Sequence, residues 1–390
     1  MHCMRTRLAL AALVTLVSPS LLGQSLLGNL HRATATTPSS IEFFVADTTS
    51  QHLFFAAADS LTGSELWMSD GTEAGTRRVE DLAPGLADSG PRWITACFGG
   101  VAYVVDDNTS TNTIRRYKLR WTDGTAANSF DLAPGPLQPT IRPELLAGKL
   151  YFVVQTPVRD FQVWCSDGTP AGTGPLSPEV FRTIPRDFIE SAGVAYFVAP
   201  DSTFRRRLFR TDGTSAGTVE VAPAADYTIG LQVPIVSVGG LLYFATQTGL
   251  WRTDGSAAGT LQVRELDSVG LLAALGQQVV FRASDTASGL EPWISDGTAG
   301  GTRLLLDLWP GPDSGLRSNF TGFVTDPVRN RVLFLATEGT LGDELWASDG
   351  TAAGTRLVKD IRPGPEGSRP FGFFTSTLSL IHISEPTRPY

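Results

Sequence analysis

The chain repeats one short phrase, and this repetition restricts its fold more than any other feature. Residues 65–76 read ELWMSDGTEAGT, and residues 344–355 read ELWASDGTAAGT. An Asp-Gly pair marks seven copies of the phrase, spaced 42 to 53 residues apart. The aspartates of these pairs are Asp70, Asp123, Asp167, Asp212, Asp254, Asp296 and Asp349. Periods of this length are typical of propellers and solenoids.

The residues around each pair predict four strands per copy. An apolar pair such as Leu345-Trp346 precedes the Asp-Gly. Adjacent side chains on a strand point to opposite faces, so this strand needs cover on both sides. A second apolar strand lies upstream, a third follows the turn, and a more irregular one such as 92–98 leads into the next Gly turn. The upstream strands are expected at 52–57, 101–105, 150–154, 194–198, 241–245, 279–282 and 332–336.

This pattern predicts an all-β fold, because no helical periodicity occurs between residues 41 and 376. Four short strands per copy favour a β-propeller of about seven four-stranded antiparallel blades. The tryptophans of the apolar pairs are expected to pack between blades. They are Trp67, Trp164, Trp251, Trp293 and Trp346, whereas the second copy has Leu119-Arg120 at this place.

The turn residues indicate a structural role for the phrase. Glycine follows every Asp, and the fifth residue after the Asp is Gly six times and Asn128 once. Because Gly and Asn tolerate positive φ best, this position is expected to be left-handed at Gly75, Gly217, Gly354 and Asn128. Ser or Thr flanks each pair and can bond the amides of its own loop. We interpret each Asp as an acceptor of amide hydrogen bonds within its own turn.

By these residues the chain resembles the ELWxxDGT repeat proteins, a group of exported bacterial sequences. The resemblance covers roughly residues 41–376, and it is specific because the motif is long and repeated. It implies a repeat architecture and a secreted or cell-surface location. It implies no established activity, so no catalytic residue is transferred. The second copy, YKLRWTDGTAANS, departs most from the family phrase.

Both ends of the chain differ from the repeats. Residues 1–24 have Arg5 and Arg7 before an apolar run, which is typical of a signal peptide. Residues 25–40 are expected to be a linker and residues 41–377 the propeller. We therefore expect an exported, soluble protein without membrane insertion after signal removal. The last residues, 378–390, break the period and resemble translated sequencing adapter, so we expect a fragment with a tail that is not native.

Charge and cysteine content narrow the function classes. The formal net charge of −8 opposes binding to phosphate backbones, so we expect no nucleic-acid partner. Apart from Cys3 in the leader, the cysteines are Cys97 and Cys165, which lie in different copies of the repeat. Two separate buried thiols are the favoured interpretation, and a disulfide stays open.

The sequence offers little conventional catalytic chemistry. His52 is the one histidine within the repeats, so neither a histidine metal site nor a Ser-His-Asp triad is expected. The turn aspartates are spread one per blade and cannot pair at one catalytic centre. No cofactor is expected, and calcium in the turns stays a weak alternative because each loop offers one carboxylate.

Two further sets of carboxylates receive structural interpretations. Three glutamates begin the tryptophan strand and are expected to be solvated or paired with a neighbouring strand: Glu65, Glu291 and Glu344. Four aspartates precede the connectors that contain Pro-Gly and are expected to cap the bend: Asp81, Asp131, Asp307 and Asp360.

Function is expected in loops that break the repeat, since residues shared by all blades serve the scaffold. These departures are 106–118, 200–207 and 60–63, each between the upstream apolar strand and the strand with the apolar pair. They carry a candidate ligand-binding set: Arg115, Arg116, Arg205, Arg206 and Arg207. Arginine suits carboxylate or sulfate groups, so an acidic extracellular polysaccharide is the first ligand class to test, with plain solvated loops as the alternative.

These observations favour a non-enzymatic, exported or cell-surface scaffold that binds an extracellular glycan or protein. A propeller-type glycan hydrolase or lyase is one alternative. A structural spacer of a longer adhesin is the other.

Overall fold

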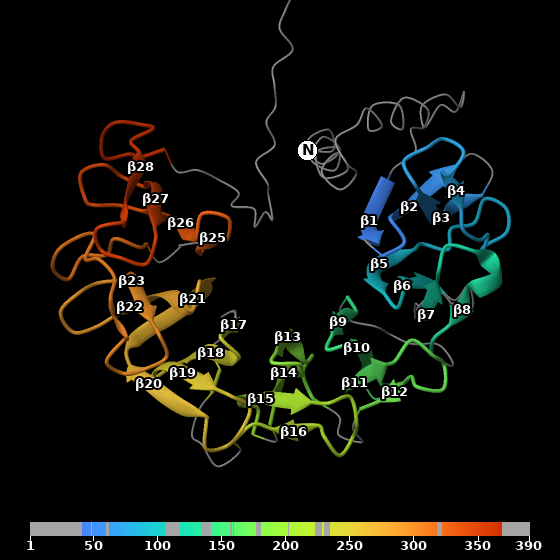
Figure 1. The fold of residues 1–390 in the computed structure, drawn as a ribbon, viewed down its shortest axis with the longest axis horizontal. Helices are drawn as coiled ribbons and strands as arrows, with labels where there is room; N and C mark the ends of the chain where they lie inside the picture. Colours follow the sequence, from blue (N-terminus) through green and yellow to red (C-terminus); the bar gives the residue numbers. More distant parts are fainter. Residues whose placement is uncertain are drawn as a thin grey trace, which may run out of the picture. The chain divides into compact units, whose positions relative to one another are not determined.

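The computed structural model describes residues 41–368, without residues 48, 60–61, 107–116, 134–141, 157, 159, 177–180, 202, 223–227, 230–234 and 318–321. The side chains of residues 41–43 are also left out of the description. The expected signal peptide, linker and C-terminal tail lie outside these residues, as do Arg115 and Arg116. The described part forms seven antiparallel sheets of four strands, which we number blades 1 to 7 (Figure 1).

Blades 1 to 3 belong to a first compact unit, Met1–Pro185 with Gly213–Ala216. Blade 1 contains β1 (Ile41–Asp47), β2 (His52–Asp59), β3 (Gly63–Ser69) and β4 (Arg77–Arg78). Blade 2 contains β5 (Arg92–Cys97), β6 (Gly100–Asp106), β7 (Tyr117–Thr122) and β8 (Phe130–Asp131), with the 3-10 turn η1 (Ala126–Asn128) before β8. Blade 3 contains β9 (Glu144–Leu146), β10 (Lys149–Gln155), β11 (Phe161–Ser166) and β12 (Gly174–Pro175).

Blades 4 to 7 belong to a second unit, Arg186–Asp212 with Gly217–Tyr390. Blade 4 contains β13 (Arg186–Ser191), β14 (Val194–Pro200), β15 (Arg206–Thr211) and β16 (Val219–Glu220). Blade 5 contains β17 (Val236–Val238), β18 (Leu241–Thr246), β19 (Gly249–Thr253) and β20 (Leu261–Glu265). Blade 6 contains β21 (Asp267–Leu275), β22 (Gln278–Ser284), β23 (Glu291–Ser295) and β24 (Arg303–Leu304). Blade 7 contains β25 (Val324–Asp326), β26 (Arg331–Ala336), β27 (Glu344–Ser348) and β28 (Arg356–Lys359).

Every blade has the same internal order, with strands hydrogen-bonded in the order in which they occur along the chain. The apolar second strand and the tryptophan strand lie in the middle of the sheet, which explains why both need cover on two faces. Within each unit, the first strand of one blade contacts the first strand of the next, as β1 does with β5 and β21 with β25. Successive four-stranded antiparallel sheets packed in this way form a β-propeller, as the repeat pattern predicted.

The hydrophobic cores lie between neighbouring blades of a unit. One cluster joins Leu275 and Ile294 of blade 6 to Phe334 and Trp346 of blade 7. Equivalent clusters join blades 1 and 2, 2 and 3, 4 and 5, and 5 and 6. Sheets that bury both faces against their neighbours expose little apolar surface to water. This burial is the main contribution to the stability of the fold.

The tryptophans occupy these clusters, which confirms their predicted place for four of five. Trp251, Trp293 and Trp346 are buried, and Trp164 packs half-buried against the cluster of blades 2 and 3. Trp67 is also half-buried, and its Nε1 donates to the Ala57 carbonyl at 3.1 Å.

Two further features of the described residues bear on the sequence analysis. Cys97 and Cys165 are both free and buried, as the favoured interpretation expected. Burial raises the pKa of the Cys97 thiol to about 12 and that of Cys165 to about 11. No helix in the described part of the chain has the length and apolar character needed to cross a membrane.

Candidate functional site

The polar side chains of the repeated phrase bond one another within each turn. In blade 7, Asp349 Oδ1 accepts hydrogen bonds from the Thr351 amide at 2.9 Å and the Thr351 hydroxyl at 2.7 Å. That hydroxyl accepts from the Gly354 amide at 2.9 Å. Ser348 Oγ accepts from the Gly350 amide at 3.0 Å. The phrase therefore supplies the side-chain acceptors for its own turn amides.

A further hydroxyl, six residues after each Asp, completes the turn and was missed in the sequence analysis. Thr355 Oγ1 lies 2.7 Å from Ser348 Oγ and donates to the Thr351 carbonyl at 2.7 Å. A Thr or Ser occupies this place in every copy, at the last position of the quoted phrase, so aligning the seven copies at that position would have revealed it. These residues are Thr76, Ser129, Thr173, Thr218, Thr260, Thr302 and Thr355.

These hydrogen bonds favour the charged form of the turn carboxylates. The Thr351 hydroxyl and amide hold the pKa of Asp349 below its ordinary value. The pKa of Asp123 is also lowered, because hydrogen bonds from Asn128 and Thr125 outweigh the opposing effect of burial. A carboxylate that stays ionised and engaged in its own turn is suited to fixing the backbone.

The glycine directly after each Asp has positive φ in all seven turns, from 85° at Gly213 to 100° at Gly124. In blades 2, 3, 5, 6 and 7 it also allows a close approach to the preceding blade of the same unit. A Cβ on Gly124 would lie 2.6 Å from Met68 Sδ, and one on Gly297 would overlap the Tyr243 hydroxyl. This glycine therefore serves both the turn and the contact between blades.

The second glycine of the turn does not have positive φ, so the predicted left-handed position was wrong. The φ angles of Gly75, Gly217 and Gly354 are not positive, and neither is that of Asn128. Glycine is needed because a Cβ here would overlap the carboxylate of the turn Asp. Asn128 is accommodated in the 3-10 turn η1, where its Nδ2 donates to Asp123 Oδ2 at 2.7 Å.

In blades 1, 6 and 7, the glutamate that begins the phrase holds the connector that follows the blade. The sequence analysis expected these glutamates to be solvated or paired with a strand, but all three are fully buried. Glu344 accepts from the amides of Ile361, Arg362 and Ser368 and from the Ser368 hydroxyl. We call this arrangement the glutamate clamp. The equivalent acceptors are Glu65, 24 residues before Ser89, and Glu291, 24 residues before Gly315.

The pKa values of the clamp carboxylates are shifted in different directions. Burial raises the pKa of Glu291 to about 7, and burial also raises that of Glu65. Burial acts in the same direction on Glu344, but the hydrogen bonds from Ser368, Arg362 and Ile361 outweigh it and lower its pKa. These perturbed groups lie on the tryptophan strands and face the connectors, where their bonds serve the fold.

Asp81, Asp307 and Asp360 do not cap the bend as expected, because the glutamate clamp of their blade binds the connector amides instead. Asp131, whose blade has no clamp glutamate, pairs with Lys118 and Arg120. Asp81, Asp307 and Asp360 each place a buried Oδ1 without a hydrogen-bond partner among the described residues. Asp81 Oδ2 lies 3.5 Å from an Arg78 nitrogen. In the described ranges, no group of three or more His, Cys, Asp or Glu side chains is arranged to hold a metal ion.

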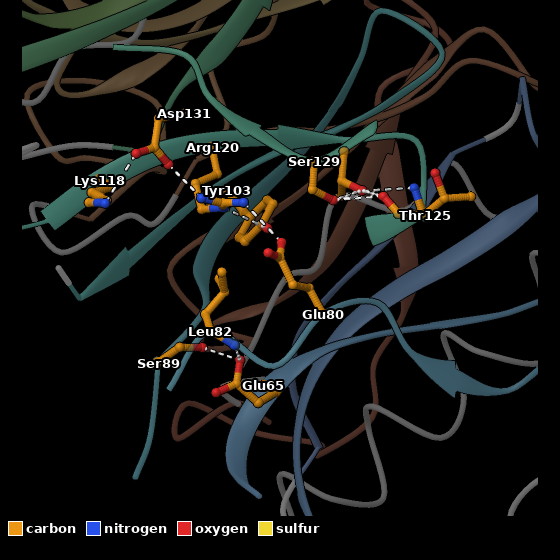
Figure 2. A network of polar contacts seen from close by, with 12 residues as sticks. Glu65, Glu80, Leu82, Ser89, Tyr103, Lys118, Arg120, Thr125, Ser129 and Asp131 are labelled. Carbon is orange, nitrogen blue, oxygen red and sulfur yellow. Dashed lines mark hydrogen bonds and ion pairs between the residues drawn. The ribbon is translucent and has the colours of Figure 1, made fainter. Parts of the chain in front are cut away.

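Blade 2 replaces the aromatic of the phrase with a charged network (Figure 2). Arg120 takes the tryptophan position opposite Tyr103 and donates to its hydroxyl at 3.3 Å. Its other nitrogens contact Asp131 at 2.6 Å and Glu80 at 2.9 Å. Glu80 follows the last strand of blade 1, so this network joins two blades. The charged network therefore takes the structural place of the missing aromatic in the second copy. The outer strand β8 still forms.

The basic set predicted in blade 4 divides into three different environments. Arg207 is 3% exposed, and it donates to Glu220 at 2.7 Å and to the Ala222 carbonyl at 3.3 Å. It occupies the clamp position of its blade and is withdrawn from the candidate ligand-binding residues. Arg206 is half-buried and lies 3.4 Å from Asp187. Arg205 is exposed.

The fold and the site together define a repeat-built β-propeller whose shared polar residues are engaged in turns and connectors. No family model matches the chain, and no curated protein matches it. Among solved structures it is similar to a puromycin hydrolase, with 15% identity and a TM-score of 0.40 over 86% of this chain and 55% of that one. The chain thus spans about half the length of that protein.

Two other solved structures are similar over most of the chain. One is the β-propeller domain of the Trilobed protease from Pyrococcus furiosus, with 12% identity and a TM-score of 0.36 over 82% of this chain and 95% of that one. The other is TolB from Acinetobacter baumannii, with 13% identity and a TM-score of 0.33 over 84% of this chain and 80% of that one. At such identities the similarity concerns the fold.

Proposed function

We propose that the protein is an exported or cell-surface β-propeller scaffold that binds an extracellular ligand without chemical turnover. The observation that carries this proposal is the engagement of the repeated polar residues in the fold. The turn aspartates bond their own turns, and the buried glutamates bond connectors. Side chains committed in this way are poorly placed to act on a substrate, so contacts are left to the links that depart from the repeat.

Export is supported by the basic and apolar pattern of residues 1–24. Expression of the full chain in a bacterial host tests it. We expect the chain outside the cytoplasm, with an intact mass that corresponds to loss of about these residues. A full-length chain retained in the cytoplasm would contradict export.

The same secreted chain tests binding against turnover. It is incubated with a polyuronate, a sulfated polysaccharide and neutral dextran, and both retention on the polysaccharide and release of soluble products are measured. We expect retention on an acidic polysaccharide with no new reducing or unsaturated ends. Release of such ends would favour the alternative of a propeller-type glycan hydrolase or lyase. Absence of any retention would favour a protein ligand or the structural spacer.

A further inference from the structure

The tip of the β14–β15 hairpin in blade 4 holds an aromatic side chain in water. Phe204 is 66% exposed, and its φ of 64° lies in the left-handed region. A bulky residue is uncommon there, because its Cβ crowds the backbone. The exposed ring gains little from burial, so folding alone does not account for an aromatic residue at this strained position.

Asp201 fixes the backbone of this tip. Its Oδ1 accepts from the Thr203 amide and hydroxyl, both at 2.7 Å, and from the Arg205 amide at 3.0 Å. The Phe204 amide donates to the Asp201 carbonyl at 3.0 Å. Burial of the Asp201 carboxyl acts to raise its pKa, but the bonds from Thr203 and Arg205 prevail and lower it. The ring is therefore presented from a preorganised turn.

The equivalent link of blade 1 shows how the chain builds such a turn without an aromatic. Asp59 accepts from the Thr62 amide and hydroxyl, both at 2.8 Å. The positive-φ residue that follows is Gly63, with φ of 61°. Glycine adopts this conformation at little cost. Blade 4 thus carries Phe204 where a glycine would fold more easily.

Basic side chains accompany the ring on an otherwise acidic chain. Arg205 is exposed beside it, and Arg206 begins β15. Arg186 is exposed on β13, and its register opposite Val198 places it at the same end of the sheet. The described acidic groups at this end include Asp187, which lies near Arg206, Glu220, which pairs with the buried Arg207, and Asp201, whose carboxylate is engaged in the turn.

These features fit an acidic sugar better than a protein. The face of an aromatic ring is electronegative and stacks on the polarised C–H groups of a pyranose, while guanidinium groups pair with carboxylate or sulfate. A stable protein interface needs roughly 800 Å² per partner with an apolar centre. Among the described residues of blade 4, the exposed large apolar side chains are Phe204 and Val219, and Val219 lies on the outer strand β16.

We propose that the Phe204–Arg205 tip is a binding subsite for a uronate or sulfated sugar residue. Phe204 stacks on the sugar ring, and Arg205 pairs with its anionic group. This inference rests on the proposed binding function and adds the site and the ligand class to it. Arg207 has a structural role and is not part of this subsite. Phe204, which the sequence analysis did not single out, makes the central contact.

Affinity electrophoresis of the full chain through polygalacturonate and dextran sulfate, with neutral dextran as reference, tests the subsite. We expect Phe204→Ala to weaken binding to the acidic polymer about 3- to 10-fold and Phe204→Tyr to retain it. Arg205→Gln is expected to weaken it about tenfold at low salt and less at high salt. Arg77→Gln is the matched control, because it removes an exposed arginine on β4 and is expected to bind like the wild type.

The outcomes separate the subsite from the broader proposal. Wild-type binding that persists in both Phe204→Ala and Arg205→Gln would overturn the subsite and leave the scaffold as a glycan binder. Equal weakening by Arg77→Gln would also overturn it, since binding would then follow net charge. If the wild type is retained by neither acidic polymer, the subsite is overturned and the scaffold is restricted to other ligands.

Discussion

The second glycine of each turn faces the carboxylate that organises the turn. At Gly354 a Cβ would overlap the Asp349 side chain, so the space is needed for an acceptor rather than for an unusual φ. The Gly-or-Asn pattern could not distinguish these causes from sequence alone, because both residue types are also the usual occupants of left-handed positions. The rule that predicts positive φ was applied to the wrong glycine of the phrase.

A double-mutant cycle tests this steric account. Gly354→Ala should destabilise the chain by about 1–3 kcal/mol through crowding. The same change should cost clearly less in an Asp349→Ala background, because the crowded carboxylate is absent. Urea unfolding of the four chains measures the coupling. Equal costs in both backgrounds would contradict contact between the two side chains.

Burial of Glu291 predicts a pH dependence of stability. Its pKa is about 7 in the folded chain, against an ordinary value of 4.5, so the folded state holds the proton more tightly. The unfolding free energy of the wild type should therefore fall, relative to Glu291→Gln, as pH rises from about 4.5 to 7. The difference should amount to ~3 kcal/mol.

Chemical unfolding of both chains at pH 4.5 and pH 8 measures this difference. Glu338→Gln provides a control on an exposed glutamate outside the clamps. A wild-type stability that changes with pH as it does in Glu291→Gln would contradict the buried, protonated clamp.

At the level of the strand, the sequence predicted the middle of each blade better than its edge. The apolar second strands lie where the pattern placed them, as β2 and β26 illustrate, because burial on both faces leaves a long apolar run. Outer strands such as β4 and β24 contain two residues each. Such short strands carry no period that a sequence pattern can detect.

The glutamate clamp could not be predicted, because its partners lie 17 to 24 residues further along the chain. Glu291 accepts from Leu308 and Gly315 through backbone amides. Amides carry no signature in the sequence, so a glutamate at a strand start appears solvated by default. The burial of Arg207 could not be predicted for a similar reason. Its position in the repeat, rather than its charge, decides whether it is buried.

The tryptophan strand predicts a graded loss of stability. Trp346 is 6% exposed within the cluster of blades 6 and 7, so Trp346→Ala should cost about 3–5 kcal/mol. Trp67 is half-buried, so Trp67→Ala should cost clearly less. Urea midpoints of the two variants check the order. A larger loss in Trp67→Ala would contradict the assignment of the packed positions.

Across the whole chain, the repeats and the departures from them have different roles. The repeated residues form turns, clamps and the packing between blades, as Asp349, Glu344 and Trp346 do in blade 7. The departures vary from one blade to another: blade 2 gains the Arg120 network, and blade 4 gains the Phe204–Arg205 tip. The sequence analysis expected function in the departures, which stays a prediction, and it singled out the basic link at 200–207. The exposed Phe204 carried no signal, since lone aromatics are common in strands and cores.

Urea unfolding midpoints of Asp349→Ala and Phe204→Gly test this division most directly. The account predicts a lower midpoint for Asp349→Ala, because the turn loses its acceptor. The corresponding loss of unfolding free energy is about 1–2 kcal/mol. It predicts an unchanged or higher midpoint for Phe204→Gly, because glycine relieves the positive φ of an exposed residue. An unchanged midpoint in Asp349→Ala together with a lowered one in Phe204→Gly would contradict the account.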